Sequence, residues 1–168
     1  QEMCDYKLDS KTKEELESLN INVIQGNQLD RDDLKLLEPF GKFDFIIDDA
    51  AHLNDAQQIT LASLFPLLKK GGKFFIEDLY CAKYRSKKLS DVKHFLNSDF
   101  IKKDFNKIYH QKDFTITHSL KHLKKTGNWK SLLLTNLEKK YLENNIDEFD
   151  LKRNYNFADD LAIITKIK

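Results

Sequence analysis

The stretch that decides the fold is Phe43-Asp-Phe-Ile-Ile-Asp-Asp-Ala-Ala-His52, followed further along by Gly71-Gly-Lys-Phe-Phe-Ile-Glu-Asp78. Each stretch reads as a buried strand that ends in acidic residues, because a continuous apolar run is typical of a strand covered on both faces. Residues 54–70 lie between them, and the spacing of their apolar side chains predicts a helix with one broad buried face. A strand, a helix and a strand in this order predict a parallel βαβ unit.

Acidic and imidazole side chains follow both predicted strands. They are Asp48, Asp49, His52, Glu77 and Asp78. In open α/β sheets the ligand crevice lies at the carboxyl ends of the strands, so we expect these residues to share one edge, called the rim below. Carboxylates beside an imidazole suit a metal site, an acid-base site or both. The plain alternative is that they cap a helix or lie solvated at a strand end.

The composition indicates one globular domain over residues 1–168, a length that allows a sizeable core. The chain has 28 Lys and Arg against 27 Asp and Glu, which gives no argument for a nucleic-acid or anionic membrane partner. No apolar run approaches the roughly 18 residues of a membrane span. The two cysteines, Cys4 and Cys81, suit a reducing compartment, so we expect a cytoplasmic protein without disulfides.

Further elements are expected on both sides of the βαβ unit. We expect helices over residues 10–19 and 30–37, a short strand over 22–25, and a tight turn at Gly71-Gly72 before a strand over 73–76. Residues 81–145 form a helical insert, with helices over 90–107 and 128–144 and a short strand over 113–118. Residues 147–155 and 161–168 read as a hairpin at the sheet edge.

This order of elements resembles that of the class I S-adenosylmethionine-dependent methyltransferases. More closely, residues 43–52 resemble the aspartate-aspartate-glycine-serine-histidine motif of the macrocin-type sugar O-methyltransferases. Three further segments are similar to that family: Leu64-Phe-Pro-Leu-Leu-Lys-Lys-Gly-Gly-Lys73, Ile76-Glu-Asp-Leu79 and Ile24-Gln-Gly-Asn-Gln-Leu-Asp30. Similarity in Asp160-Leu-Ala-Ile-Ile-Thr-Lys166 is weaker. The combination is fairly specific, although each segment alone is a weak signal.

The resemblance implies an α/β fold: a Rossmann-like methyltransferase sheet, mostly parallel with a C-terminal antiparallel hairpin, that lacks its first strand in this chain. Two departures stand out. The family has glycine and serine where this chain has Ala50 and Ala51. None of the five glycines forms a G-x-G motif, the loop that normally cradles the methionine part of the cofactor. We expect that loop upstream of Gln1; otherwise the protein cannot bind the cofactor in the usual way.

The resemblance also implies roles for the rim residues. Asp48 and Asp49 would contribute to a Mg²⁺ site, with Asp78 as a third ligand, and His52 would be the catalytic base with Asp49 beside it. Hard oxygen ligands suit Mg²⁺, and a divalent ion lowers the pKa of a bound hydroxyl.

The S-adenosylmethionine site implied by the resemblance involves other residues. Asp5 is the candidate for the ribose hydroxyls, and Asn27 and Gln28 are candidates for the adenine edge, with Asp48 placed in the same group. A simple turn at residues 26–27 is the competing interpretation.

We therefore predict an S-adenosylmethionine-dependent, Mg²⁺-assisted O-methyltransferase that acts on a sugar hydroxyl of a glycan or a glycosylated small molecule. The insert at residues 81–145 is expected to shape the acceptor pocket or the interface of a homo-oligomer. Two alternatives stay open, because one fold hosts many activities. One is a non-catalytic methyltransferase-like module in a larger glycan-biosynthesis protein. The other is a metal-dependent enzyme of different chemistry on the same fold.

Overall fold

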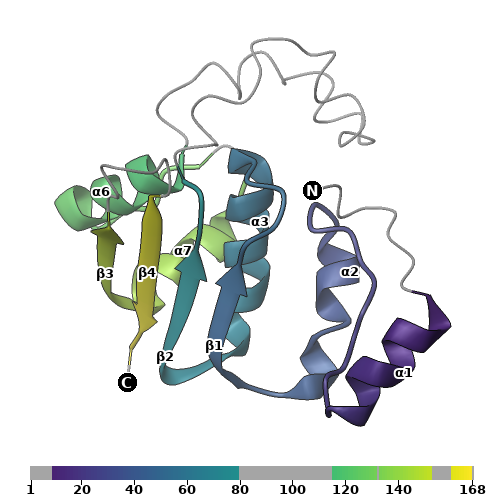
Figure 1. The fold of residues 1–168 in the computed structure, drawn as a ribbon. Coiled ribbons are helices and arrows are strands. Elements are labelled where there is room, and N and C mark those ends of the chain that lie inside the picture. The colour runs from purple at the N-terminus through teal and green to yellow at the C-terminus, as the bar shows by residue number, and fades with distance from the viewer. Residues whose placement is uncertain (1–8, 80–114, 132, 153–159, 168) are drawn as a thin grey trace, which may run out of the picture.

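The computed structural model of the protein describes residues 9–79, 115–131, 133–152 and 160–167, which form one mixed sheet with helices against it (Figure 1). The strand order is β1-β2-β4-β3. β1 (Phe43–Asp48) runs parallel to β2 (Leu68–Ile76). β4 (Leu161–Lys166) is antiparallel to both β2 and β3 (Ile146–Lys152). The α/β class and the C-terminal antiparallel hairpin are confirmed.

Helices lie on one face of this sheet and beside its β1 edge. α3 (Asn54–Leu64), α6 (Ile116–Thr126) and α7 (Asn136–Asn145) lie against one face (Figure 1). α1 (Ser10–Ser18) and α2 (Arg31–Lys35) lie beyond the β1 edge of the sheet. Two short 3-10 helices complete the described elements: η1 (Glu38–Phe40) follows α2 in the chain, and η2 (Phe65–Leu67) follows α3. Within the described ranges, no helix has both the length and the apolar character needed to cross a bilayer.

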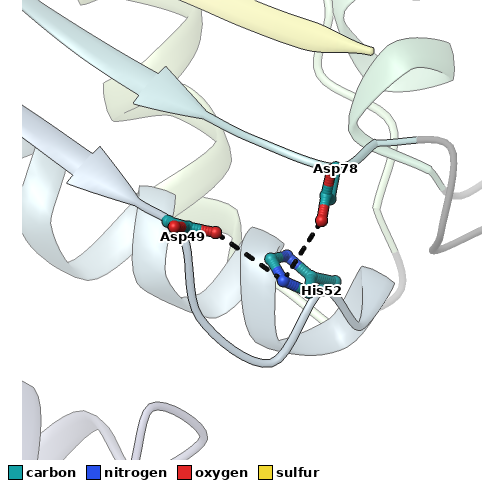
Figure 2. Close-up of side chains that lie close together, drawn as sticks. All are labelled: Asp49, His52 and Asp78. Carbon is teal, nitrogen blue, oxygen red and sulfur yellow. Dashed lines mark ion pairs between the residues drawn. The ribbon is translucent and has the colours of Figure 1, made fainter. Parts of the chain in front are cut away.

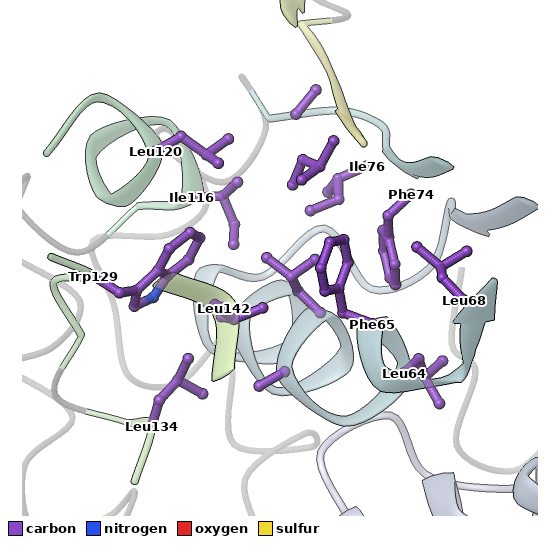
Figure 3. Packing of buried hydrophobic residues seen from close by; sticks show 14 of the residues in the cluster. Leu64, Phe65, Leu68, Phe74, Ile76, Ile116, Leu120, Trp129, Leu134 and Leu142 are labelled. Carbon is purple, nitrogen blue, oxygen red and sulfur yellow. The ribbon is translucent and has the colours of Figure 1, made fainter. Parts of the chain in front are cut away.

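The hydrophobic core lies between the sheet and these helices (Figure 3). Phe74 and Ile76 of β2 are fully buried against Phe65, which follows α3, and Leu142 of α7 is equally buried. Fully burying one such side chain contributes about 1.5–3 kcal/mol. Because this core joins β2 to α3, it also fixes where the two rim loops lie relative to each other.

A long-range ion pair attaches α2 to α7. Arg31 Nε lies 2.6 Å from Glu138 Oε1, and Arg31 Nη2 also donates to the Leu133 carbonyl at 3.2 Å. Glu138 at the same time belongs to the capping box of α7 with Thr135. The start of α2 is thereby held against an element more than a hundred residues later.

The helix predicted over residues 54–70 is too long. In the structure α3 ends at Leu64, and η2 follows because Pro66 has no N–H to continue the helical hydrogen bonds. β2 begins at Leu68, and Gly71 and Gly72 lie inside it at a bulge, where the pairing with β1 shifts register, rather than in a turn. Gly71 has φ +75°, and a Cβ on Gly72 would lie 3.0 Å from the Asp44 carbonyl oxygen.

Three other predicted elements need correction, and a fourth lies outside the described residues. Residues 22–25 form no strand, because they have no ladder partner in the described part of the chain. The predicted strand over 113–118 is wrong where described, since Thr115 caps α6 there. The helix expected from residue 128 begins only at Asn136, after the Thr135 cap. The helix expected over 90–107 lies outside the described residues.

Among the described residues, helices cover one face of β1, whereas the sequence predicted coverage on both. Ile46 packs against the core, but Phe45 and Ile47 are each 63% exposed on the opposite face. Within the described ranges, the helices that match the apolar run of β1 lie on the α3 side.

Candidate functional site at the rim of the sheet

The rim is formed where β1 and β2 end side by side. β1 stops at Asp48 and β2 at Ile76, and the Glu77 N–H donates to the Asp48 carbonyl at 3.0 Å. This bond continues the parallel ladder one step past β2. The loop from Asp49 to α3 and the loop that starts at Glu77 are thus adjacent, as expected for a βαβ unit.

Three side chains converge at this rim (Figure 2). His52 Nε2 lies 3.3 Å from Asp78 Oδ2 and 3.7 Å from Asp49 Oδ1. One ligand atom from each residue lies within 4.8 Å of those of the other two, so the three could hold one metal ion. We call Asp49, His52 and Asp78 the rim cluster. Its imidazole is 15% exposed and its carboxylates are 62% and 27% exposed, so it opens to solvent through Asp49.

Two members of the rim cluster have unusual backbones. His52 has φ +51° and Asp78 has φ +53°, both in the left-handed region. For residues with a Cβ this conformation costs roughly 1–2 kcal/mol each. Such strain persists only where surrounding contacts impose it, and it gathers at functional sites. Here it turns both side chains toward each other across the rim.

The donor set of the rim cluster fits Mg²⁺ with a nearby base. Asp49 and Asp78 supply carboxylate oxygens, and Mg²⁺ typically takes one or two carboxylates and keeps waters. The Nδ1 atom of His52 is buried and has no hydrogen-bond partner among the described residues. Only Nε2 therefore faces the carboxylates and the solvent side of the rim.

Asp48 lies apart from the rim cluster, although the sequence grouped it with the metal ligands. It is 4% exposed, and its Oδ1 accepts a 2.6 Å hydrogen bond from Gln28 Nε2. Gln28 Oε1 in turn accepts from the Ala51 N–H at 3.2 Å. Burial raises the pKa of Asp48 to about 6, against the lowering effect of the Gln28 bond.

A cavity of about 310 Å³ opens beside Asp48. It lies between α2, β1 and α3, and its polar lining includes Gln28, Asp33, Asp48, Asp49 and Thr60. Within the described residues, the buried atoms Asp48 Oδ2 and Thr60 Oγ1 have no hydrogen-bond partner. The cavity thus offers an apolar wall with two unpaired polar atoms, as small-molecule sites commonly do.

The remaining sequence candidates have other surroundings. Asn27 forms a turn: its Oδ1 accepts from the Leu29 N–H at 2.9 Å, and its own N–H donates to Asp33 Oδ2 at 2.8 Å. Gln28 contacts Asp48 as described, and Asp5 lies outside the described residues. The structure thus brings together Asp49, His52 and Asp78, and separately Gln28 and Asp48.

Sequence reasoning missed Gln57, whose Nε2 donates to the Glu77 carbonyl at 3.1 Å. Gln57 lies on α3 and is almost fully buried. A glutamine within the buried stretch of an amphipathic helix, one turn after His52, was the available signal. A buried polar side chain there needs a partner, and the rim backbone is the nearest source of one.

Comparisons with known proteins show which proteins this chain resembles. No family model matches the chain. The mycinamicin VI 2''-O-methyltransferase of Micromonospora griseorubida is 38% identical over 78 residues, which are 46% of this chain and 20% of that protein. The demethylmacrocin O-methyltransferase of Streptomyces fradiae is 37% identical over the same length. The chain thus spans about a fifth of the length of the curated relatives that it matches.

Solved structures of the MycE methyltransferase from the mycinamycin biosynthetic pathway, in complex with Mg and SAH, have a similar fold. Two crystal forms match with TM-scores of 0.57 and 0.56 at 25% and 26% identity. Each match covers 89% of this chain and about a third of the solved chain. The methyltransferase-like α/β fold and the resemblance to macrocin-type sugar O-methyltransferases are therefore confirmed over these shared portions.

Proposed function

We propose that this protein is an S-adenosylmethionine-dependent, Mg²⁺-assisted O-methyltransferase that acts on a sugar hydroxyl of a glycan or a glycosylated small molecule. The rim cluster is the observation that carries the proposal, because it joins two carboxylates and one imidazole at a solvent-open edge. The sugar O-methyltransferases among its relatives support the reaction class. The other parts of the earlier prediction, a cytoplasmic location and a homo-oligomer, remain predictions.

In this mechanism His52 is the base that takes the proton from the acceptor hydroxyl. Its Nε2 is the available atom, because Nδ1 is buried. Asp78 and Asp49 lie 3.3 Å and 3.7 Å from Nε2 and hold the imidazole at the rim. The same two carboxylates would hold Mg²⁺, which when bound orients the acceptor oxygen and lowers the pKa of its hydroxyl.

The cavity beside Asp48 is our candidate for the cofactor pocket. It borders Asp49, so a molecule held there lies next to the rim cluster. Asp48 Oδ2 and Thr60 Oγ1 are unpaired acceptors on its wall and suit a ligand with N–H or O–H donors. In this assignment Gln28 orients the Asp48 carboxylate through the 2.6 Å hydrogen bond.

Calorimetric titration of S-adenosylhomocysteine, with and without Mg²⁺, tests cofactor binding. Micromolar binding to this chain would support the pocket assignment. Binding only by a chain extended upstream would mean that the cofactor needs residues before Gln1. Binding by neither would refute the methyltransferase proposal and favour the non-catalytic module or a different metal-dependent chemistry.

Turnover of the intact protein tests the role of His52. A general base contributes typically 10²- to 10⁴-fold in rate, so His52→Ala should lower kcat by about that factor. His122→Asn is the matched control, because that imidazole lies on α6 and belongs to neither the rim cluster nor the cavity. A His52→Ala rate equal to the control would remove His52 from the mechanism.

A further inference from the structure

The side chain of Gln57 links α3 to the rim backbone. Gln57 is 1% exposed, and its Nε2 donates to the Glu77 carbonyl at 3.1 Å. The bond is partly buried and joins a helix side chain to a loop backbone, so it favours one placement of the loop after β2. The bond joins the first turns of α3 to the residue immediately before Asp78.

Glu77 is held on both sides of its backbone. Its N–H donates to the Asp48 carbonyl at 3.0 Å, and its C=O accepts from Gln57. Two residues further on, the Leu79 N–H donates to the Asp160 carbonyl at 3.0 Å. Asp78 therefore lies between two anchored residues, which explains how its left-handed φ of +53° is maintained.

Gln57 also belongs to the helix that starts just after His52. α3 begins at Asn54, so the position of Gln57 follows rigidly from the end of the His52 loop. The hydrogen bond to Glu77 consequently fixes the His52 side of the rim cluster relative to the Asp78 side. His52 Nε2 and Asp78 Oδ2, which lie 3.3 Å apart, come from the two segments that this bond joins.

We propose that Gln57 is a positioning residue that sets the geometry, and hence the cation affinity, of the rim cluster. The proposal rests on the proposed function, since that function assigns a cation to Asp49 and Asp78. Residues that orient metal ligands typically change metal affinity by 10- to 100-fold when they are removed. The side chain of Gln57 hydrogen-bonds to the Glu77 carbonyl and not to a member of the rim cluster, so it acts through the Glu77 peptide.

Gln57→Met tests this role, because methionine keeps the length of the side chain and removes the donor. Mn²⁺ alone, titrated into the intact protein and followed by electron paramagnetic resonance, reports affinity without turnover. We expect binding at least tenfold weaker than in the wild type. Ile59→Val is the matched control: Ile59 is also a buried residue of α3, the change removes one methyl group and no hydrogen bond, and Mn²⁺ affinity should stay within twofold of the wild type. Wild-type affinity in Gln57→Met would overturn the proposal.

Amide hydrogen exchange without metal separates this proposal from the proposed function. Gln57→Met should speed exchange at the Glu77 and Leu79 amides by at least tenfold relative to Ile59→Val, while the Phe74 amide in β2 changes equally in both. In the wild type, one Gln57 side-chain N–H should exchange slowly. If the wild type binds no Mn²⁺, the metal assignment fails, and the exchange data alone support or refute the positioning role. Unchanged exchange at both amides refutes it.

Discussion

The two faces of the sheet differ in what covers them, although both present apolar side chains. On the α3 side, Phe74, Ile76 and Ile164 are fully buried beneath α3, α6 and α7 (Figures 1 and 3). On the opposite side, Phe45 and Ile47 are 63% exposed, and Phe75 and Ile163 lie beside them in the same register. Neighbouring residues of one strand thus have very different surroundings, because their side chains alternate between the faces.

This difference indicates which face of the sheet contributes most to the stability of the described part of the chain. Burial free energy scales with the apolar area removed from water, so the α3 side supplies most of it. The site depends on the same side, since α3 carries Gln57 and follows His52. Changes on the covered face should therefore affect both folding and the rim, whereas changes on the open face should affect neither strongly.

The largest expected effect is that of Phe74→Ala in β2, compared with the same change at its neighbour Phe75. Phe74→Ala should lower the free energy of unfolding by about 3–5 kcal/mol, because it opens a cavity in the core. Phe75→Ala, one residue further on the open face, should cost about 1 kcal/mol, chiefly its contact with Phe45. Urea denaturation of both variants measures the difference. Equal losses would contradict the contrast between the faces.

Asp48 lies on the covered face, and its burial should make stability depend on pH. Its pKa rises from an ordinary 3.8 to about 6, so the folded state keeps a proton that the unfolded chain has released. Stability from this group is therefore greatest below about pH 4 and falls as pH rises to 6, a loss of about 3 kcal/mol for two pKa units. Asp48→Asn should be more stable than the wild type above pH 6, with the difference shrinking toward pH 4. Urea unfolding across this range measures it, and a difference independent of pH would refute it.

A buried lysine, Lys166, lies on the covered face at the end of the sheet opposite the rim. Lys166 Nζ donates to the carbonyls of Leu68 at 2.9 Å, Pro66 at 3.1 Å and Phe65 at 3.4 Å. Lys166→Met would leave these carbonyls without that donor and should cost about 1–3 kcal/mol. Thermal unfolding measures the loss. Lys152→Met, an exposed position of β3, is the control and should change little.

The smallest effect is expected on the open face. Phe45→Thr keeps a strand-favouring residue but removes the exposed ring that contacts Phe75, so the free energy of unfolding should fall by no more than about 1 kcal/mol. The chain should also self-associate less, since large exposed apolar patches favour association. Urea denaturation and sedimentation measure the two effects. A loss of several kcal/mol would mean that this face is packed in solution.

The fold could be predicted where local signals agree with tertiary contacts. The bounds of β1, Phe43–Asp48, follow from an apolar run closed by aspartates, and the end of β2 follows from Glu77. The start of β2 could not be placed, because Leu68 continues the apolar spacing of the helix before it and Gly71-Gly72 is typical of a turn. A short apolar run does not distinguish a helix end from a strand, and here the packing of Leu68 decides.

Of the candidate site, the convergence of Asp49, His52 and Asp78 was predictable from strand ends alone. The separate position of Asp48 was not predicted, although the alternation of side chains along a strand indicates it. Asp48 lies on the same covered face of β1 as Ile46, whereas Asp49 lies beyond the end of the strand. The left-handed backbones of His52 and Asp78 leave no mark in the sequence. The contact between Gln57 and Glu77, next to Asp78, likewise exists only after the chain has folded.

The strand order β1-β2-β4-β3 has a consequence for synthesis on the ribosome. β4 is the latest of these strands in the chain, yet it lies between β2 and β3. When β3 leaves the exit tunnel, its partner is still inside, so β2 has an unpaired edge and β3 has no neighbour. Domains generally fold as units during translation, and this one can close its sheet only when residues 161–166 emerge.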